Sequence, residues 1–260
     1  MALVYSNKRM EKHSRPRVLF IVPAYNERES LPGVIADLRQ HFPDDQILVV
    51  DDGSTDDTVA LAGIHLAEVV RLPFNLGIGA TVQTGLLYAV RNGYDIAVQF
   101  DGDGQHRADQ VEKLLAQLDF ADAVIGSRFL ERNSYRGSIF RRAGIFIFRL
   151  VNSILVGATI TDNTSGFRAY GPRAIRFLAE EYPHDYPEPE SVITLCRAGY
   201  RVKEVAVVMQ RRMGGQSSIG LLKSVYYMAK VLVAVGIGVT RTRARSLQNG
   251  SANPGYLDHR

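Results

Sequence analysis

Four short apolar runs in the first half of the chain constrain its fold more than any other feature. They cover residues 18–22, 47–50, 96–100 and 121–125. Runs of this length, rich in β-branched residues, are typical of strands buried on both faces of a parallel sheet. Apolar residues also recur at helical spacing over residues 31–41, 58–66, 80–92 and 108–118. Strand alternating with helix predicts an α/β fold with a mostly parallel, Rossmann-like sheet flanked by helices.

Acidic residues follow the third apolar run directly, and in such sheets ligands bind beyond the carboxyl ends of the strands. Asp101 and Asp103 are separated by Gly102, so both carboxylates can converge on one hard divalent cation, Mg²⁺ or Mn²⁺. Gln105 could add a third oxygen, and His106 could orient a ligand or touch phosphate. A pattern this short is more often a solvated turn, but its position after a strand favours the metal site.

Two further strand ends carry groups suited to a nucleotide. Pro23 is expected to end the first strand, Tyr25 could pack on a base, and Glu27 could accept from a ribose hydroxyl or cap a helix. Asp51 and Asp52 follow the second run and could hydrogen-bond a base or ribose. A glycine-rich stretch at residues 75–80 resembles a phosphate-binding loop, with a plain helix start as an equal alternative.

Composition sets the broad class of protein. The chain has 260 residues, of which 46% are hydrophobic and 22% charged, which favours a folded protein of one large domain or two small lobes. The formal charge of +4 suits an anionic ligand or membrane surface but does not single out nucleic acid. Cys196 is the sole cysteine, which excludes an internal disulfide and favours a reducing compartment.

Together the motifs resemble the inverting family 2 glycosyltransferases of the GT-A fold. The matching segments are VPAYNERESL (22–31), VVDDGSTDDT (49–58), NLGIGATVQTG (75–85), FDGDGQH (100–106), TSGFRAY (164–170) and RRMGGQSS (211–218). Each motif is short, but their joint occurrence in this order is specific. The chain looks most like the dolichyl- or undecaprenyl-phosphate sugar synthases, which move one sugar from a nucleotide donor to a lipid phosphate.

The resemblance implies a role for each matching residue. Mg²⁺ or Mn²⁺ is expected on Asp101, Asp103 and Gln105. The nucleotide-sugar is expected on Pro23, Ala24, Tyr25, Glu27, Asp52, Gly79, Asp101, Gly102 and Asp103. Arg128 and Arg212 are expected to contact phosphates and to form the catalytic group with Asp103, since a guanidinium fork matches phosphate oxygens. The lysine usual after the serine of the last motif is Ser218 here.

The acceptor decides whether a catalytic base is needed. A sugar hydroxyl must lose a proton as it attacks, whereas a lipid phosphate is already ionised. Asp185, Glu188 and Glu190, in the turn-rich segment 180–190, are the candidate bases. The first hypothesis is therefore inverting transfer to a polyprenyl phosphate, and the second is extension of a cell-surface polysaccharide or lipid-linked glycan at a hydroxyl. A nucleotidyltransferase or a noncatalytic sugar-nucleotide binder is a remote third.

Changes in composition divide the chain into five expected segments. They are a basic tail (1–16), a nucleotide-sugar-binding half (17–130), an acceptor-binding half (131–218), an apolar interfacial or oligomerisation helix (219–240) and a mobile basic tail (241–260). Amphipathic helices with basic flanks, as at 139–158 and 224–239, can lie in a lipid interface. Buried core helices are the alternative reading. The run at 225–239 is shorter than the roughly 20 residues that a spanning helix needs.

These features lead us to expect a peripheral enzyme on the cytoplasmic face of a membrane. The expected partners are a nucleotide-sugar donor, a polyprenyl phosphate or lipid-linked glycan, the membrane surface, a small membrane protein and further copies of the chain, with no nucleic acid.

Overall fold

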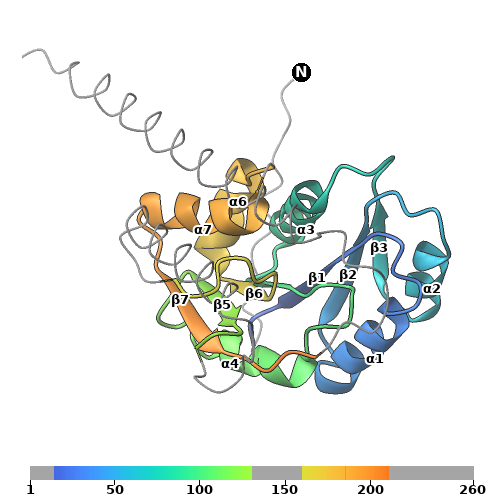
Figure 1. The fold of residues 1–260 in the computed structure, drawn as a ribbon, viewed down its shortest axis with the longest axis horizontal. Coiled ribbons are helices and arrows are strands. Elements are labelled where there is room, and N and C mark those ends of the chain that lie inside the picture. Colours follow the sequence, from blue (N-terminus) through green and yellow to red (C-terminus); the bar gives the residue numbers. More distant parts are fainter. Residues whose placement is uncertain (1–14, 131–159, 185, 211–260) are drawn as a thin grey trace, which may run out of the picture.

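The computed structural model of the chain describes residues 15–130, 160–184 and 186–210. Within them, strands form one sheet in the order β3-β2-β1-β4-β6-β5-β7 (Figure 1). The strands are β1 (Val18–Ala24), β2 (Gln46–Asp51), β3 (Glu68–Arg71), β4 (Ile96–Gln99), β5 (Ala123–Ser127), β6 (Arg168–Tyr170) and β7 (Val202–Ala206). β6 runs antiparallel to β4 and β5, and the other pairs are parallel. The predicted mostly parallel α/β sheet is confirmed.

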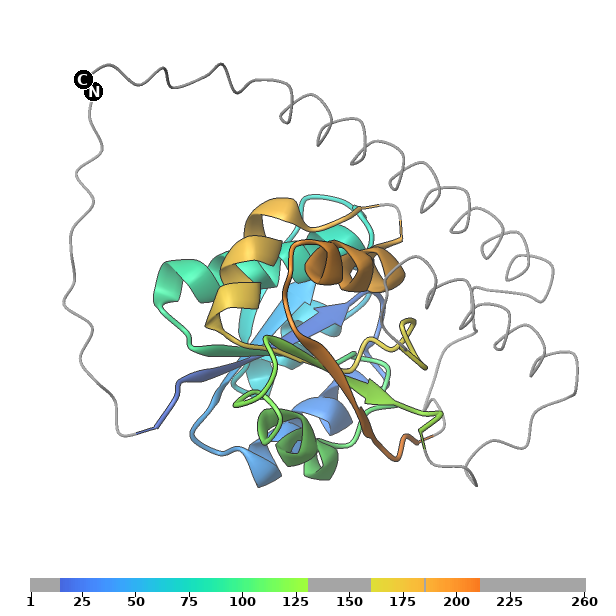
Figure 2. The ribbon, with the colours of Figure 1, turned by 90° about the vertical axis from the view of Figure 1, so that its left-hand side faces the viewer.

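Helices cover both faces of the sheet. They are α1 (Leu31–His41), α2 (Thr58–Ile64), α3 (Ile78–Asn92), the 3₁₀ turn η1 (Ala108–Gln110), α4 (Val111–Leu115), α6 (Pro172–Glu181) and α7 (Pro187–Arg197). Figure 1 shows α1, α2 and α4 on one side of the sheet and α3, α6 and α7 on the other. Figure 2, turned by 90°, shows the same three layers. None of the helices in these ranges has the length and apolar character needed to cross a membrane.

The central strand β1 explains why its sequence is apolar without alternation. All seven of its residues are buried. Phe20 and Val22 pack into the hydrophobic cluster under α1 and α4, whereas Leu19 and Ile21 pack into the cluster under α3 and α6. A strand with helices on both faces needs apolar side chains on both, so the run 18–22 was a correct strand prediction.

The prediction that Pro23 ends the first strand is wrong. Pro23 lies inside β1 and pairs with Val50 of β2. The ladder between β1 and β4 ends at Ile21 and Gln99, and the Pro23 carbonyl beyond it accepts the N–H of Gly102 at 3.3 Å. Pro23 would have directed its N–H toward β4, but the β1–β4 ladder has already ended there, so no ladder hydrogen bond is lost. A strand tolerates proline at such a position.

The turn-rich interpretation of residues 180–190 is also partly wrong. Helix α7 begins at Pro187, and Pro189 lies in its first turn. Proline is tolerated there because the first N–H groups of a helix have no intrahelical acceptor. The short strands β3 and β6 were not predicted. The described residues leave out positions 1–14 and 241–260 of the expected tails and the apolar stretches 139–158 and 224–239. They also leave out residues 131–159, 185 and 211–218 of the proposed acceptor-binding half.

Candidate active site

Hydrogen bonds between side chains and backbone tie the loop after β1 to the loop after β2. The Asn26 N–H donates to Ser54 Oγ at 2.9 Å, and Asn26 Oδ1 accepts the Thr55 N–H at 2.9 Å. The Glu27 N–H donates to Thr58 Oγ1 at 2.9 Å. Asn26 has a φ of 54°, a left-handed conformation that asparagine tolerates better than most residues. Two of the predicted nucleotide-binding segments thus form one connected surface.

The carboxylate of Asp52 fastens a third loop to this surface. It accepts the backbone N–H groups of Leu76 at 2.7 Å and Gly77 at 2.9 Å. The neighbouring Asp51 is fully buried and lies 3.3 Å from Nε of Arg71 at the end of β3. Asp52 therefore holds the glycine-rich loop in place, a contact that sequence reasoning did not predict. Its contact with a nucleotide stays a prediction.

The turn at Gly53 leaves no room for a side chain. Its φ is 73°, and a Cβ there would lie 2.8 Å from the carbonyl carbon of Phe74. Only glycine satisfies both conditions. Tyr25, in the loop after β1, is 46% exposed despite its size. Its stacking on a nucleotide base stays a prediction.

Gly79 permits a close approach at the start of α3. A Cβ at this position would lie 3.0 Å from the Pro183 carbonyl oxygen and 3.2 Å from Cα of His184. The glycine therefore lets the segment after α6 pack against the first turn of α3. The structure supports a packing role here, and the predicted role in donor binding stays a prediction.

The predicted metal carboxylates lie in a tight turn after β4. The Asp103 Oδ1 atom accepts the N–H of Gln105 at 3.0 Å. A Cβ on Gly102 would lie 3.0 Å from the carbonyl oxygen of Pro23, so glycine lets the turn pack against the end of β1. The Gln105 carbonyl accepts the N–H of Gln210 at 2.8 Å, which connects this turn to the segment after β7.

His106 is buried behind Asp101 and orients it. Its Nδ1 accepts the Asp101 N–H at 3.0 Å, and its Nε2 lies 3.5 Å from Asp101 Oδ2. The ring stacks on Phe167 at a centroid distance of 4.7 Å. Burial lowers the pKa of His106 to about 4, although the nearby Asp103 carboxylate opposes that shift. A neutral imidazole at pH 7 thus contacts both the backbone and the carboxylate of Asp101 and orients it, as residues that hydrogen-bond to metal ligands do.

The Asp101 carboxylate also meets the backbone of the loop that precedes β6. A Cβ at Gly166 would lie 2.3 Å from Asp101 Oδ2. This glycine therefore lets main chain pack directly against a predicted metal ligand. The motif containing it was recognised in the sequence, but its contact with Asp101 was not.

The donor atoms present fit a divalent metal that a substrate helps to bind. The described residues contain no group of three or more histidine, cysteine, aspartate or glutamate side chains able to hold a metal ion. A Mg²⁺ ion in such sites typically takes one or two carboxylates and fills its shell with substrate phosphate and water. The pair Asp101 and Asp103 satisfies this requirement.

Arg128, predicted to contact phosphate, is anchored by a carboxylate. Its Nε and Nη2 donate to the two oxygens of Asp162, both at 2.7 Å, and its backbone N–H donates to the same group at 3.0 Å. Asp162 is buried, and its own N–H donates to Glu204 Oε1 at 2.7 Å. The Arg128 side chain is 36% exposed, so it is held from one side while part of it still reaches solvent. Arg212, its predicted companion, lies outside the described residues.

Two of the three candidate bases, Glu188 and Glu190, lie in the first turn of α7. Glu188 is half-buried in the first turn of α7. Burial raises its pKa, the Arg168 guanidinium opposes the rise, and the Asp101 carboxylate adds to it. Glu188 is thus close enough to Asp101 to feel its charge. Glu190 lies in the same first turn, and Asp185 falls outside the described residues.

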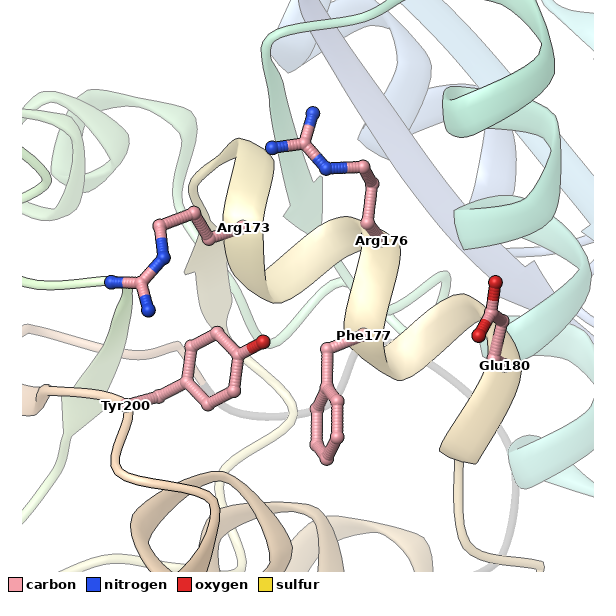
Figure 3. Close-up of a pocket in the computed structure, with 5 residues that line it drawn as sticks. All are labelled: Arg173, Arg176, Phe177, Glu180 and Tyr200. Atoms are coloured by element: carbon pink, nitrogen blue, oxygen red, sulfur yellow. The ribbon is translucent and has the colours of Figure 1, made fainter. Parts of the chain in front are cut away.

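A hollow of about 340 Å³ lies elsewhere on the surface (Figure 3). Arg173, Arg176, Phe177 and Glu180 of α6 line it together with Tyr200, which precedes β7. Tyr200 and Arg173 lie at the amino ends of the parallel strands, opposite the predicted site, and the hollow extends from there along α6. It shares no residue with the motifs above, and we assign the chemistry to the strand ends instead.

A model of glycosyl transferase family 2 matches residues 19–177. The chain belongs to this family. An undecaprenyl-phosphate mannosyltransferase of Micrococcus luteus is 33% identical over 223 residues, covering 78% of this family 2 chain and 87% of the relative. A polyprenol monophosphomannose synthase of Mycolicibacterium smegmatis is 38% identical over 164 residues, covering 59% and 61%. The predicted glycosyltransferase activity is confirmed at the level of the family.

Two solved structures share the fold of this chain. A mannosyl-3-phosphoglycerate synthase from Rubrobacter xylanophilus has a TM-score of 0.62 at 18% identity, covering 94% of this chain and 79% of its own. A glucosyl-3-phosphoglycerate synthase from Mycobacterium tuberculosis, crystallised with Mn²⁺ and UDP-glucose, has a TM-score of 0.62 at 20% identity, covering 86% and 79%. The predicted GT-A fold of this family 2 glycosyltransferase is confirmed.

Proposed function

We propose that this glycosyltransferase moves a sugar from a nucleotide-sugar to a polyprenyl phosphate, with inversion and with the help of Mg²⁺ or Mn²⁺. The observation that carries the proposal is the carboxylate pair Asp101 and Asp103, built into a tight turn at the end of β4 and held by His106. The activities named for the two similar mannosyltransferases support the choice of acceptor.

The donor would bind across the joined loops of the first half. Tyr25 would stack on the base, and Glu27 and Asp52 would face the nucleoside. Pro23, Ala24 and Gly102 would form the wall beside the diphosphate, with Gly79 at the start of α3. Asp101 and Asp103 would hold the metal, with Gln105 as a third oxygen donor. A bound Mg²⁺ or Mn²⁺ would neutralise charge on the departing nucleoside diphosphate.

In the proposed reaction, an oxygen of the polyprenyl phosphate forms a bond to the anomeric carbon as the bond to the nucleotide diphosphate breaks. Attack on the face opposite the leaving group inverts the anomeric centre. The acceptor oxygen already carries negative charge, so no proton has to be removed. Arg128, held by Asp162, would present its remaining guanidinium surface to a phosphate, with Arg212 beside it.

A second candidate function is transfer to a sugar hydroxyl, as in the extension of a cell-surface or lipid-linked glycan. The position of Glu188 favours it, because this carboxyl lies near Asp101 and burial raises its pKa. A carboxyl of that kind could accept the proton of an attacking hydroxyl. Asp185 and Glu190 would be the alternative bases.

We further propose that the enzyme is peripheral, at the cytoplasmic face of a membrane where a lipid acceptor would be presented. Residues 17–130 would form the donor half and residues 131–218 the acceptor half. The helix expected at 219–240 would contact the lipid interface or another copy, and a small membrane protein could anchor the complex. Recovery of all the protein in a detergent-free soluble fraction, with lipid present, would contradict peripheral attachment.

The test is transfer from a panel of UDP- and GDP-sugars to a short polyprenyl phosphate, with Mn²⁺, Mg²⁺ or EDTA. A glycolipid formed with one donor and lost in EDTA is the expected result. The Asp103→Asn variant should fold normally and form none. Transfer by Asp103→Asn at the wild-type rate would refute the metal assignment. Loss of turnover in Glu188→Gln, with donor binding intact, would favour the hydroxyl acceptor.

A further inference from the structure

A fully buried arginine, Arg168, connects parts of the site that are far apart in the sequence. It is the first residue of β6 and is 1% exposed. Burial by itself would lower its pKa, but the nearby Tyr170, Tyr182 and Glu188 side chains raise the pKa above its ordinary value. The side chain is therefore a buried cation. Such a charge is costly unless hydrogen bonds satisfy it, so its contacts should explain its presence.

The Arg168 guanidinium donates four hydrogen bonds, which reach two different segments. Nε donates to the Ser165 carbonyl and Nη2 to the Asn163 carbonyl, both at 2.7 Å. Nη1 donates to Ser191 Oγ at 2.7 Å, and Nη2 also donates to the Glu188 carbonyl at 2.8 Å. One planar group thus joins the loop before β6 to the first turns of α7.

The first segment lies against the predicted metal ligand, and the second is near enough for its Glu188 carboxyl to interact with that ligand's charge. Gly166 directly follows the carbonyl that Nε holds, and its Cα packs against the Asp101 carboxylate so closely that a Cβ would overlap it. Glu188, whose carbonyl Nη2 holds, has a side chain that feels the Asp101 charge. Displacement of either segment would change the surroundings of Asp101.

We propose that Arg168 is a positioning residue for the metal site. By holding residues 163–165 and the start of α7 together, it fixes Gly166 against Asp101 and sets where Asp101 points. This inference rests on the proposed metal role of Asp101, but it does not depend on the identity of the acceptor. It requires the fork of a guanidinium, because a lysine ammonium cannot reach both segments with the same geometry.

The test measures binding of Mn²⁺ to the full chain, alone and with UDP or GDP against a blank without protein, by the loss of the electron paramagnetic resonance signal of free Mn²⁺. Arg168→Lys keeps the charge but loses the fork, so its dissociation constant for Mn²⁺ should rise about tenfold, in the range seen when groups that orient metal ligands are changed. Ser191→Ala removes one of the four contacts and should raise it about threefold. Melting curves establish that each variant is folded at the temperature of the measurement.

The matched control is Arg173→Lys, because Arg173 is paired with Asp122 at 3.1 Å at the opposite edge of the sheet. This variant should bind Mn²⁺ like the wild type. A role in folding alone would lower the melting temperature of Arg168→Lys and leave Mn²⁺ binding by the folded protein unchanged. That result would overturn the inference. If Arg168→Lys does not fold, Ser191→Ala decides by the same criterion.

The outcomes separate this inference from the proposed function. Weaker Mn²⁺ binding by Arg168→Lys, together with no transfer to polyprenyl phosphate by the wild type, would support the inference and refute the acceptor. A wild-type protein that binds no Mn²⁺, whether alone or with UDP or GDP present, would contradict the metal site, and the positioning role with it.

Discussion

The two halves of the sheet present polar residues to the active-site edge in opposite ways. In the first half, β1, β2 and β4 run toward this edge, and the polar loops come after the strands. In the second half, β6 is antiparallel, so its beginning faces the same edge. The loop that carries Asp162 and Gly166 therefore comes before its strand. The active-site edge therefore combines loops that follow parallel strands with a loop that precedes an antiparallel strand.

The two halves of the sheet also differ in which residues hold the loops of the active-site edge in place. In the first half, hydrogen bonds join loops to one another, as between Asn26 and Ser54. In the second half, residues within strands hold the loop, since Arg168 of β6 and Glu204 of β7 bind its backbone. We infer that the first half provides the ligands for the donor and the metal, and that the second half positions them.

The largest expected effect is that of Asp101→Asn. The amide keeps the size of the side chain but removes the charge that the metal requires, so turnover should fall by about 1000-fold or more. Binding of Mn²⁺ should be lost, while the circular dichroism spectrum stays unchanged. An Asp101→Asn protein that retains Mn²⁺-dependent turnover would show that the first half does not hold the metal.

A smaller effect is expected from Asp162→Asn in the second half. Arg128 would lose its bidentate partner while its charge remains, so kcat should fall by about 30-fold through loss of orientation. Donor affinity should change little, because this residue lies outside the first-half loops. Equal losses in donor affinity and kcat would break the proposed division between binding and positioning.

Acidification should expose the role of His106. Its folded pKa of about 4 lies below the ordinary 6.5, so the unfolded chain binds more protons between these values. The contribution of neutral His106 to the free energy of unfolding is therefore fully present above pH 6.5. It falls as the pH drops toward 4, by about 1 kcal/mol at pH 5.5. Urea unfolding of metal-free wild type and His106→Asn should show this loss in the wild type alone. Parallel pH profiles would contradict a buried neutral histidine.

The smallest effect on catalysis is expected from Asp122→Asn, which matches Asp162→Asn at the opposite edge. Asp122 is buried, accepts the Arg201 N–H at 2.9 Å and pairs with Arg173 at 3.1 Å. The variant should lose about 1–2 kcal/mol of stability by urea unfolding, while kcat stays within about twofold. A fall in kcat as large as that of Asp162→Asn would mean that buried ion pairs affect turnover equally at both edges of the sheet, which would contradict the comparison.

The sequence was informative where polar residues follow apolar strands. The positions of Asp52, Asp101 and Asp103 at one sheet edge follow from that pattern, because parallel strands end together. The pattern could not reveal the roles of Asp162, Arg168 and Glu204. Asp162 lies in the loop before β6, the sequence does not show that β6 runs antiparallel, and the partners of these residues are distant in the chain. β6 has only three residues, too few for an alternation to be visible.

Predictions from local sequence were wrong where tertiary contacts decided the structural role of a residue. Pro23 stays in a strand because pairing on its N–H side has already ended. Pro187 and Pro189 start a helix rather than a turn. The exposure of Tyr25 and the anchoring of Arg128 by Asp162 also required the fold.

The central claim is most directly tested by comparing two acceptors that differ only in the phosphate. Wild-type enzyme with its preferred nucleotide-sugar and Mn²⁺ is incubated with a short polyprenyl phosphate or with the matching polyprenol, and labelled glycolipid is measured. The account predicts product from the phosphate, none from the alcohol, and none from either after EDTA. Transfer to the alcohol, or transfer that survives removal of the metal, would contradict it.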